Sequence, residues 1–177
     1  MLPHVIAFLL AQGAPVESVP SSVPVLQPEE AARFAAEGRR TMARINGEVT
    51  GWSDEQFSSA LTAAFSGRTK LIYQEGHGVF AEYTAPDGQL RMWYPNNQAV
   101  VKGRWGVQRV SDAVRICFHY FNSTNPVTRE FEPRECIPAA QALSEVPVLR
   151  SWPGDVFNLM SDRIPYRKGL MDMPAPQ

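Results

Sequence analysis

The most constraining feature of this sequence is a change in the spacing of its apolar residues near Thr69. Before that point apolar side chains recur every three to four residues, and after it apolar and polar residues alternate. Alternation places successive side chains on opposite faces of a strand, so the second part of the chain is predicted to form a sheet. A length of 177 residues favours a single domain.

The alternating region divides into candidate strands separated by turn sequences. Ala85-Pro86-Asp87-Gly88 is the clearest turn, because proline presets φ at its second position and glycine accepts the strained last one. Short strands at close spacing predict an antiparallel meander sheet that is closed or half-closed into a barrel. The candidate strands are 69–74, 79–84, 89–94, 98–107, 113–121, 129–136 and a late one around 155–161.

Two helices are expected before the sheet. The first begins at Pro28, whose missing N–H is no loss at the first helical position, and it ends at Asn46-Gly47. The second begins after Ser53, because Ser53-Asp54-Glu55-Gln56 fits a capping box, and it ends at Ser66-Gly67. The fold class is therefore mainly β (α+β), with two N-terminal helices that form a lead-in over residues 28–65. Their apolar stripes are Ala31, Phe34, Ala35, Met42 and Ile45 in the first helix and Phe57, Leu61, Ala64 and Phe65 in the second.

The two ends of the chain differ in composition from the middle. A short apolar run, 5–11, is followed by the small-x-small pattern Ala11-Gln12-Gly13, and together they predict a signal peptide over 1–13. No Lys or Arg precedes the run, and the alternatives are an N-terminal strand or a misplaced start codon. Residues 14–27 hold three prolines and predict an extended tether, and 162–177 predicts an irregular tail after a β-barrel-like domain over 66–161. No apolar run approaches the ~18 residues of a transmembrane helix.

The two cysteines bear on the compartment. Cys117 and Cys136 are 19 positions apart, and in an oxidising compartment they would form one disulfide, worth roughly 3 kcal/mol of stability in the chain-entropy model. Two free thiols in a cytosolic protein are the alternative. Combined with the signal pattern, the pair favours a periplasmic or secreted protein. A zinc site formed by these cysteines and His119 is the weaker interpretation because no Cys-x-x-Cys pair is present, and we expect no metal and no cofactor.

The sheet region resembles a known family. The motifs that carry the resemblance are Gly67-Arg68-Thr69, Phe80, Ala85-Pro86-Asp87-Gly88, Gly103-Arg104-Trp105-Gly106-Val107, Ile116-Cys117-Phe118 and Cys136. In this order they are similar to the bacterial "domain of unknown function 995" family, over about residues 66–137. The resemblance implies a small exported protein with a calycin-like (lipocalin-related) barrel. It implies no catalytic residues.

One face of the expected sheet gathers basic and aromatic side chains. If the strands are neighbours, that face carries Arg91, Trp93, Lys102, Arg104, Arg115 and His119, which could bind an acidic polysaccharide, an anionic lipid or an envelope protein. An ordinary solvated outer face explains the same alternation. Glu82 would lie opposite Arg91 and neutralise it if the intervening turn has a two-residue loop, whereas a bulged loop would shift the register by one residue.

Composition and motifs limit the function classes. A formal net charge of −1 gives no reason to expect nucleic-acid binding, and no serine lies in a nucleophile-elbow motif. We therefore expect a non-catalytic exported protein that binds a ligand or assists envelope or polysaccharide assembly. A protein-interaction or inhibitor module, docking through an edge strand or the tether, is the alternative, and a hydrolase with a site around His119 is the weaker one.

Overall fold

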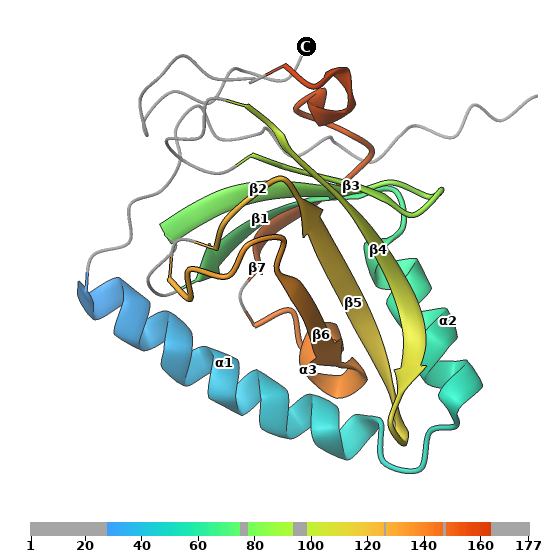
Figure 1. Ribbon diagram of the computed structural model, residues 1–177. Coiled ribbons are helices and arrows are strands. Elements are labelled where there is room, and N and C mark those ends of the chain that lie inside the picture. The colour runs from blue at the N-terminus through green and yellow to red at the C-terminus, as the bar shows by residue number, and fades with distance from the viewer. Residues whose placement is uncertain (1–27, 75–77, 94–98, 126, 147, 164–177) are drawn as a thin grey trace, which may run out of the picture.

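The structure is a computed structural model, which describes residues 28–74, 78–93, 99–125, 127–146 and 148–163. The predicted signal peptide and tether, and the predicted tail beyond residue 163, lie outside the described residues. Within them, one antiparallel sheet of seven strands curls into a half-barrel, and helices cover one of its faces (Figure 1). The expectation of a mainly β fold with a half-closed antiparallel sheet and two N-terminal helices is confirmed.

The strands form a meander with one displaced member. The sheet order is β6-β5-β4-β3-β2-β1-β7, so neighbours in sequence pair with each other except that the last strand pairs with the first. The strands are β1 (Arg68–Gln74), β2 (Gly78–Thr84), β3 (Gln89–Trp93), β4 (Val101–Val110), β5 (Ala113–Phe121), β6 (Arg134–Pro138) and β7 (Val148–Pro153). In the described part of the chain no ladder joins β6 to β7, so the curl stays open between these two edge strands.

The turn between β2 and β3 sets the register of the sheet. The backbone N–H of Ala85 donates to the carbonyl of Gln89 at 2.9 Å, which leaves three residues in the loop, and Gly88 adopts a φ of 81° there. This is the longer of the two loops considered from the sequence. Because it shifts the pairing by one residue, Glu82 and Arg91 lie on opposite faces, and the expectation that they neutralise each other is wrong.

The two predicted helices are present as α1 (Pro28–Glu48) and α2 (Asp54–Phe65). Both halves of the predicted capping box form: the backbone N–H of Gln56 donates to the Ser53 hydroxyl, and the Gln56 side chain accepts from the Ser53 N–H. A third helix, α3 (Ala139–Leu143), was not predicted. α1 contacts α3 and comes so close to Val146 that any side chain at Gly38 would collide with it. None of the helices in the described ranges is long and apolar enough to cross a bilayer.

Both faces of the sheet are partly buried, and the buried part of each face lies over different strands. We call the face on which α2 and α3 pack the inner face and the opposite one the outer face. The inner core joins α2 and α3 to β3, β4 and β5, with Leu61, Phe65, Leu90, Val114, Ile116, Phe118, Ala139 and Ala142 buried. The outer core joins β1, β2, β3 and β7 to the segment after β7, with Leu71, Val79, Ala81, Tyr83, Trp93, Trp152, Phe157 and Leu159 among its buried members.

The end of the sheet region differs from the prediction. The expected strand at 155–161 is instead a turn followed by the short 3₁₀ helix η1 (Leu159–Ser161). The Asp155 carboxylate accepts the backbone N–H groups of Leu159 and Met160, both at 2.8 Å, and this local bonding replaces strand pairing. The last strand, β7, lies earlier and ends at Pro153. It pairs only with β1 as an edge strand, where proline is tolerated.

Two other strand boundaries also moved. β6 begins at Arg134 and not at 129, because Arg129 and Glu132 have positive φ values of 64° and 48°, which no strand accommodates. β4 begins at Val101 and ends at Val110, whereas the predicted strand was 98–107. The predicted disulfide is formed: Cys117 and Cys136 lie directly opposite each other on β5 and β6 and are bonded.

Candidate functional site

The six residues predicted to form a basic face do share one face of the sheet. Alternation along β3, β4 and β5 places all of them on the outer face: Arg91, Trp93, Lys102, Arg104, Arg115 and His119. Cross-strand pairing aligns Arg91 with Lys102 and Arg104 with His119. They do not, however, form one site, because their surroundings differ.

Three of the six residues, namely Arg91, Trp93 and Lys102, are either buried or paired with a carboxylate. Trp93 is 4% exposed and belongs to the outer core, where it packs and does not form an accessible aromatic surface. The Arg91 guanidinium donates to Asp162 at 2.9 Å, and the Lys102 ammonium donates to the other oxygen of the same carboxylate at 2.5 Å. Both cations hold the pKa of Asp162 below its usual value. Asp162 comes from a stretch that the sequence analysis assigned to an irregular tail.

Two of the remaining three residues, Arg104 and His119, line a shallow hollow on the outer face. Arg104, His119 and Arg134 lie in one cross-strand row over β4, β5 and β6, beside the disulfide, and line a hollow of about 310 Å³. His119 stacks edge-on against Phe121 at 4.7 Å between ring centroids. Arg115 is half-buried on the far side of the disulfide from this row, and its guanidinium reaches the carbonyl of Cys136 at 3.4 Å.

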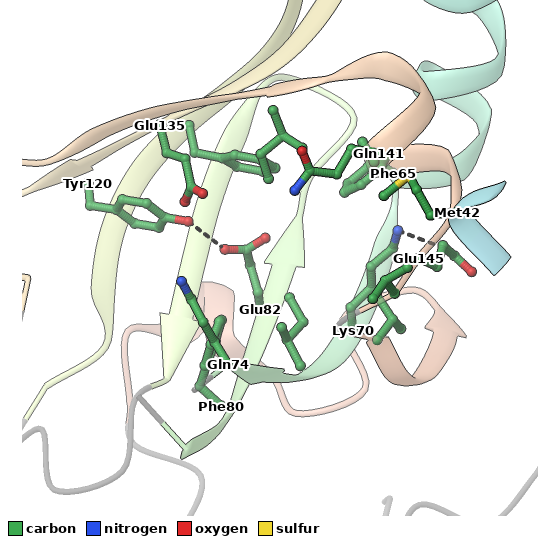
Figure 2. A pocket seen from close by; sticks show the side chains of 16 residues that line it. Met42, Phe65, Lys70, Gln74, Phe80, Glu82, Tyr120, Glu135, Gln141 and Glu145 are labelled. Atoms are coloured by element: carbon green, nitrogen blue, oxygen red, sulfur yellow. Dashed lines mark hydrogen bonds and ion pairs between the residues drawn. The ribbon is translucent and has the colours of Figure 1, made fainter. Parts of the chain in front are cut away.

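The more enclosed cavity lies on the other face of the sheet, where no site was predicted. Its volume is about 280 Å³, and it opens between the inner face, α1 and α3 (Figure 2). The wall is mainly apolar: Met42, Phe65, Ile72, Phe80, Phe118, Ile137, Ala142, Val146 and Val148 line it. Four ionisable side chains that could carry function also line it, namely Lys70, Glu82, Glu135 and Glu145, together with the Tyr120 hydroxyl group.

Lys70 is one of the two deeply buried charged groups in this lining. Its side chain is 2% exposed, projects from β1 and donates to the Glu145 carboxylate at 2.8 Å. The ammonium nitrogen also lies 3.4 Å from the centroid of the Phe65 ring, within reach of a cation–π interaction. Burial lowers the pKa of Lys70, and the hydrogen bond and charge of Glu145 oppose that shift.

Glu82 lies opposite Lys70 in the β1–β2 ladder, but its side chain turns toward the other end of the cavity (Figure 2). It is 3% exposed and accepts a hydrogen bond from the Tyr120 hydroxyl at 3.0 Å. Burial raises the pKa of Glu82 to about 7, although the Tyr120 hydrogen bond and the charge of Lys70 act in the opposite direction. Burial raises the pKa of Tyr120 as well, and the charges of Glu82 and Glu135 add to that effect.

Glu135 completes this end of the cavity. It projects from β6, where Phe118 pairs with it, and its carboxyl group faces Tyr120 and Glu82 in Figure 2. Glu135 is more exposed than Glu82, and partial desolvation raises its pKa too. Among the described residues, neither Glu82 nor Glu135 has a Lys, Arg or His nitrogen within salt-bridge distance.

Sequence reasoning missed this site although a signal was present. In the strand pattern, Lys70, Glu82 and Glu135 occupy the positions that point to the inner face, among residues such as Ile72 and Phe80. A charged residue at a core-facing position is the unusual observation, whereas basic residues on a solvated face are expected. The number of charged residues on a face indicates the six residues of the outer face, but it does not show which face of the sheet is buried.

The alternative of a metal site does not fit the cysteines. Because Cys117 and Cys136 are bonded to each other, they supply no thiolate for a metal ion. Throughout the described ranges, no group of three His, Cys, Asp or Glu side chains is placed to hold a metal ion. The resemblance of residues 66–137 to the domain of unknown function 995 family stays a prediction. No protein-family model, no curated protein and no solved structure matches this chain.

Proposed function

We propose that this chain is a non-catalytic binding protein that holds a small, mainly apolar ligand in the cavity of the inner face. The single observation that carries the proposal is the cavity itself: about 280 Å³ of space within the fold, with an apolar wall and a few convergent polar groups. Ligand sites in proteins usually have this character, with volumes from roughly 300 Å³ upward. Its size suits a compact ligand, smaller than a drug-like molecule.

We also propose that the protein is exported and works in the periplasm or outside the cell. The disulfide between Cys117 and Cys136 supports this, because such bonds persist in oxidising compartments and are rare in the cytosol. The apolar run at 5–11 also supports export, because such a run is typical of the apolar core of a signal peptide. The intact mass of protein isolated from its own host tests the idea: cleavage after residue 13 together with one disulfide is expected. An uncleaved chain with two free thiols would contradict it.

A neutral fluorescent probe tests cavity binding directly. N-phenyl-1-naphthylamine should bind the purified protein with one-to-one stoichiometry, and its emission should shift to the blue, because the probe leaves water for an apolar wall. Ile72→Trp places a large side chain in the cavity and should weaken binding at least about tenfold. Val148→Trp, from the neighbouring strand β7, provides a second blocking variant in case the first one folds poorly.

The control is a tryptophan added elsewhere. Val127 is 52% exposed in the loop before β6 and does not line the cavity, so Val127→Trp should bind the probe as the original protein does. Equal affinity in all the variants would show that the probe binds somewhere else. That result would contradict the proposal.

The outer hollow supports a second candidate function, namely binding of an acidic polysaccharide or an anionic lipid surface. The specific observation is the row of Arg104, His119 and Arg134, for which no carboxylate lies within salt-bridge distance among the described residues. Binding of this kind should weaken steeply as salt is raised. The double reversal Arg104→Glu and Arg134→Glu should abolish retention on an acidic polysaccharide column at low salt, and unchanged retention would remove this candidate.

A further inference from the structure

We infer that the inner cavity selects a ligand with a protonated amine on an apolar body, and that the carboxylates of Glu82 and Glu135 hold the ammonium group. This inference rests on the proposed function and narrows it to one class of ligand, an organic cation. It depends on the balance of charge in the cavity, on the position of its unpaired carboxylates and on the nature of the remaining wall.

The charges that line the cavity do not balance. Among the lining residues that the structure describes, Lys70 is the only cationic side chain, whereas Glu82, Glu135 and Glu145 are three acidic ones. Glu145 is already paired with Lys70 at 2.8 Å. The other two carboxyl groups are left without a cation, and they lie together at the Tyr120 end of the cavity (Figure 2). A ligand that brings one positive charge to this end would neutralise one of these two carboxylates.

The hydrogen bonding of Glu82 leaves a position for that charge. The side chain is 3% exposed, and its Oε2 accepts the Tyr120 hydroxyl at 3.0 Å, while no described residue donates a hydrogen bond to Oε1. An ionised carboxylate accepts several hydrogen bonds and is costly to bury without them. The three N–H groups of a primary ammonium could reach Oε1 of Glu82 and the carboxylate of Glu135 together.

The apolar part of the ligand has a place as well. Ile72, Ile137 and Val148 contribute apolar surface to the same lining, together with Met42 of α1 and Ala142 of α3. An anionic ligand is the less suitable class, since it would have to displace Glu145 from Lys70 and lie near two further carboxyl groups. An uncharged ligand would leave the buried carboxyl group of Glu82 without its missing donors.

The protonation state of Glu82 gives this inference a pH signature. The groups that face Glu82 are Lys70 on β1, Tyr120 on β5, Glu135 on β6 and, beyond Lys70, Glu145. With its pKa at about 7, Glu82 is mostly neutral at pH 6 and mostly ionised at pH 8. Only the ionised form holds an ammonium, so the affinity for an amine should rise about tenfold between these pH values. Binding below pH 7 should release a proton.

Three ligands with the same chain and different heads provide the experiment. Octylamine, octanol and octanoate are titrated into the full-length protein by calorimetry at pH 6 and pH 8, in two buffers of different ionisation enthalpy. Octylamine should bind at pH 8 at least about tenfold more tightly than octanol, and octanoate most weakly. Octanol should bind equally well at both pH values, since its head carries no charge.

The variants assign the effect to the two carboxyl groups. Glu82→Gln should remove most of the preference for octylamine over octanol, together with its pH dependence and the proton release, and Glu135→Gln should reduce the preference less. Glu130→Gln, in the exposed loop before β6, is the matched control and should behave as the original protein does. Binding of octanol with no preference for octylamine, or a preference that survives Glu82→Gln, would overturn the inference and leave the proposed function standing. If none of the three ligands binds, the proposed function fails as well.

Discussion

The inner and outer faces of the sheet carry charged residues under opposite conditions. The outer face has more of them, including Arg104 and Arg134, but most are exposed or share a partner with a neighbour, as Arg91 and Lys102 share Asp162. The inner face has few, and two of them, Lys70 and Glu82, are enclosed by apolar side chains. A charge surrounded by water interacts weakly with its neighbours, and the same charge in an apolar cavity interacts strongly. Burial therefore distinguishes the stronger candidate site here, although the outer face holds the larger number of cations.

The largest predicted effect is a dependence of the unfolding free energy on pH, which arises from Glu82 on the inner face. The folded pKa of Glu82, about 7, lies above the ordinary value of 4.5, so the folded state keeps a proton that the unfolded state has lost. The stability contributed by this group is complete below pH 4.5 and is lost as the pH rises to 7. We expect urea unfolding to give a free energy about 2 to 3 kcal/mol smaller at pH 8 than at pH 5.

Glu82→Gln isolates the source of this effect. The variant cannot ionise at this position, so its unfolding free energy should change much less between the two pH values, and Glu135, whose pKa is also raised, accounts for the remainder. Glu130→Gln replaces an exposed carboxylate and should keep the pH dependence of the original protein. A stability that is equally pH-dependent after Glu82→Gln would mean that the buried carboxyl group does not control it, and the comparison between the faces would lose its main support.

The ion pair in the cavity should give the next largest effect, and an asymmetric one. Glu145→Gln leaves the ammonium of Lys70, 2% exposed, without its partner, and we expect a loss of about 2 kcal/mol in the unfolding free energy. Lys70→Met leaves Glu145 at the cavity rim, where water can solvate it, and should change stability by less than about 1 kcal/mol. Chemical unfolding at pH 7 measures both variants. A larger loss for Lys70→Met than for Glu145→Gln would contradict this account.

The ion pairs of the outer face should give the smallest effect. Asp162→Asn weakens the links to Arg91 and Lys102, but Lys102 is 52% exposed and Arg91 keeps hydrogen bonds to Leu90 and Gln89. We expect a loss of less than about 1 kcal/mol, reduced further in 1 M salt. The loss caused by Glu145→Gln should hardly depend on salt. Equal salt sensitivity of the two variants would show that the two sites are equally solvated.

Local patterns in the sequence were sufficient for much of the fold. The capping box at Ser53 and the opposite faces of Arg115 and Ile116 depend on residues a few positions apart, and both are present in the structure. The disulfide was also anticipated, because only two cysteines had to be paired. The late strand was placed wrongly because Asp155 bonds the backbone of its own segment, and an apolar composition alone does not distinguish that turn from a strand.

The candidate site could not be predicted in the same way. Its residues come from β1, β2, β5, β6 and the segment after α3, and only the curl of the sheet and the packing of α3 bring them together. The sequence already contained charged residues at core-facing positions, which was the available signal. Whether Lys70 would meet Glu145, or Glu82 would meet Tyr120, depended on contacts across 75 and 38 positions of the chain.

Taken by itself, the sequence determined the two N-terminal helices and the first six strands in their order, the face to which the residues of these strands point and the pair of cysteines that bond. These follow from backbone geometry and capping, which act between near neighbours. The tertiary structure alone decided the register after the Ala85–Gly88 turn, the half of each face that is covered, and the enclosure of Glu82 in an apolar cavity. Burial is a property of the assembled layers, and it is burial that raises the pKa of Glu82 and makes the inner face a candidate site.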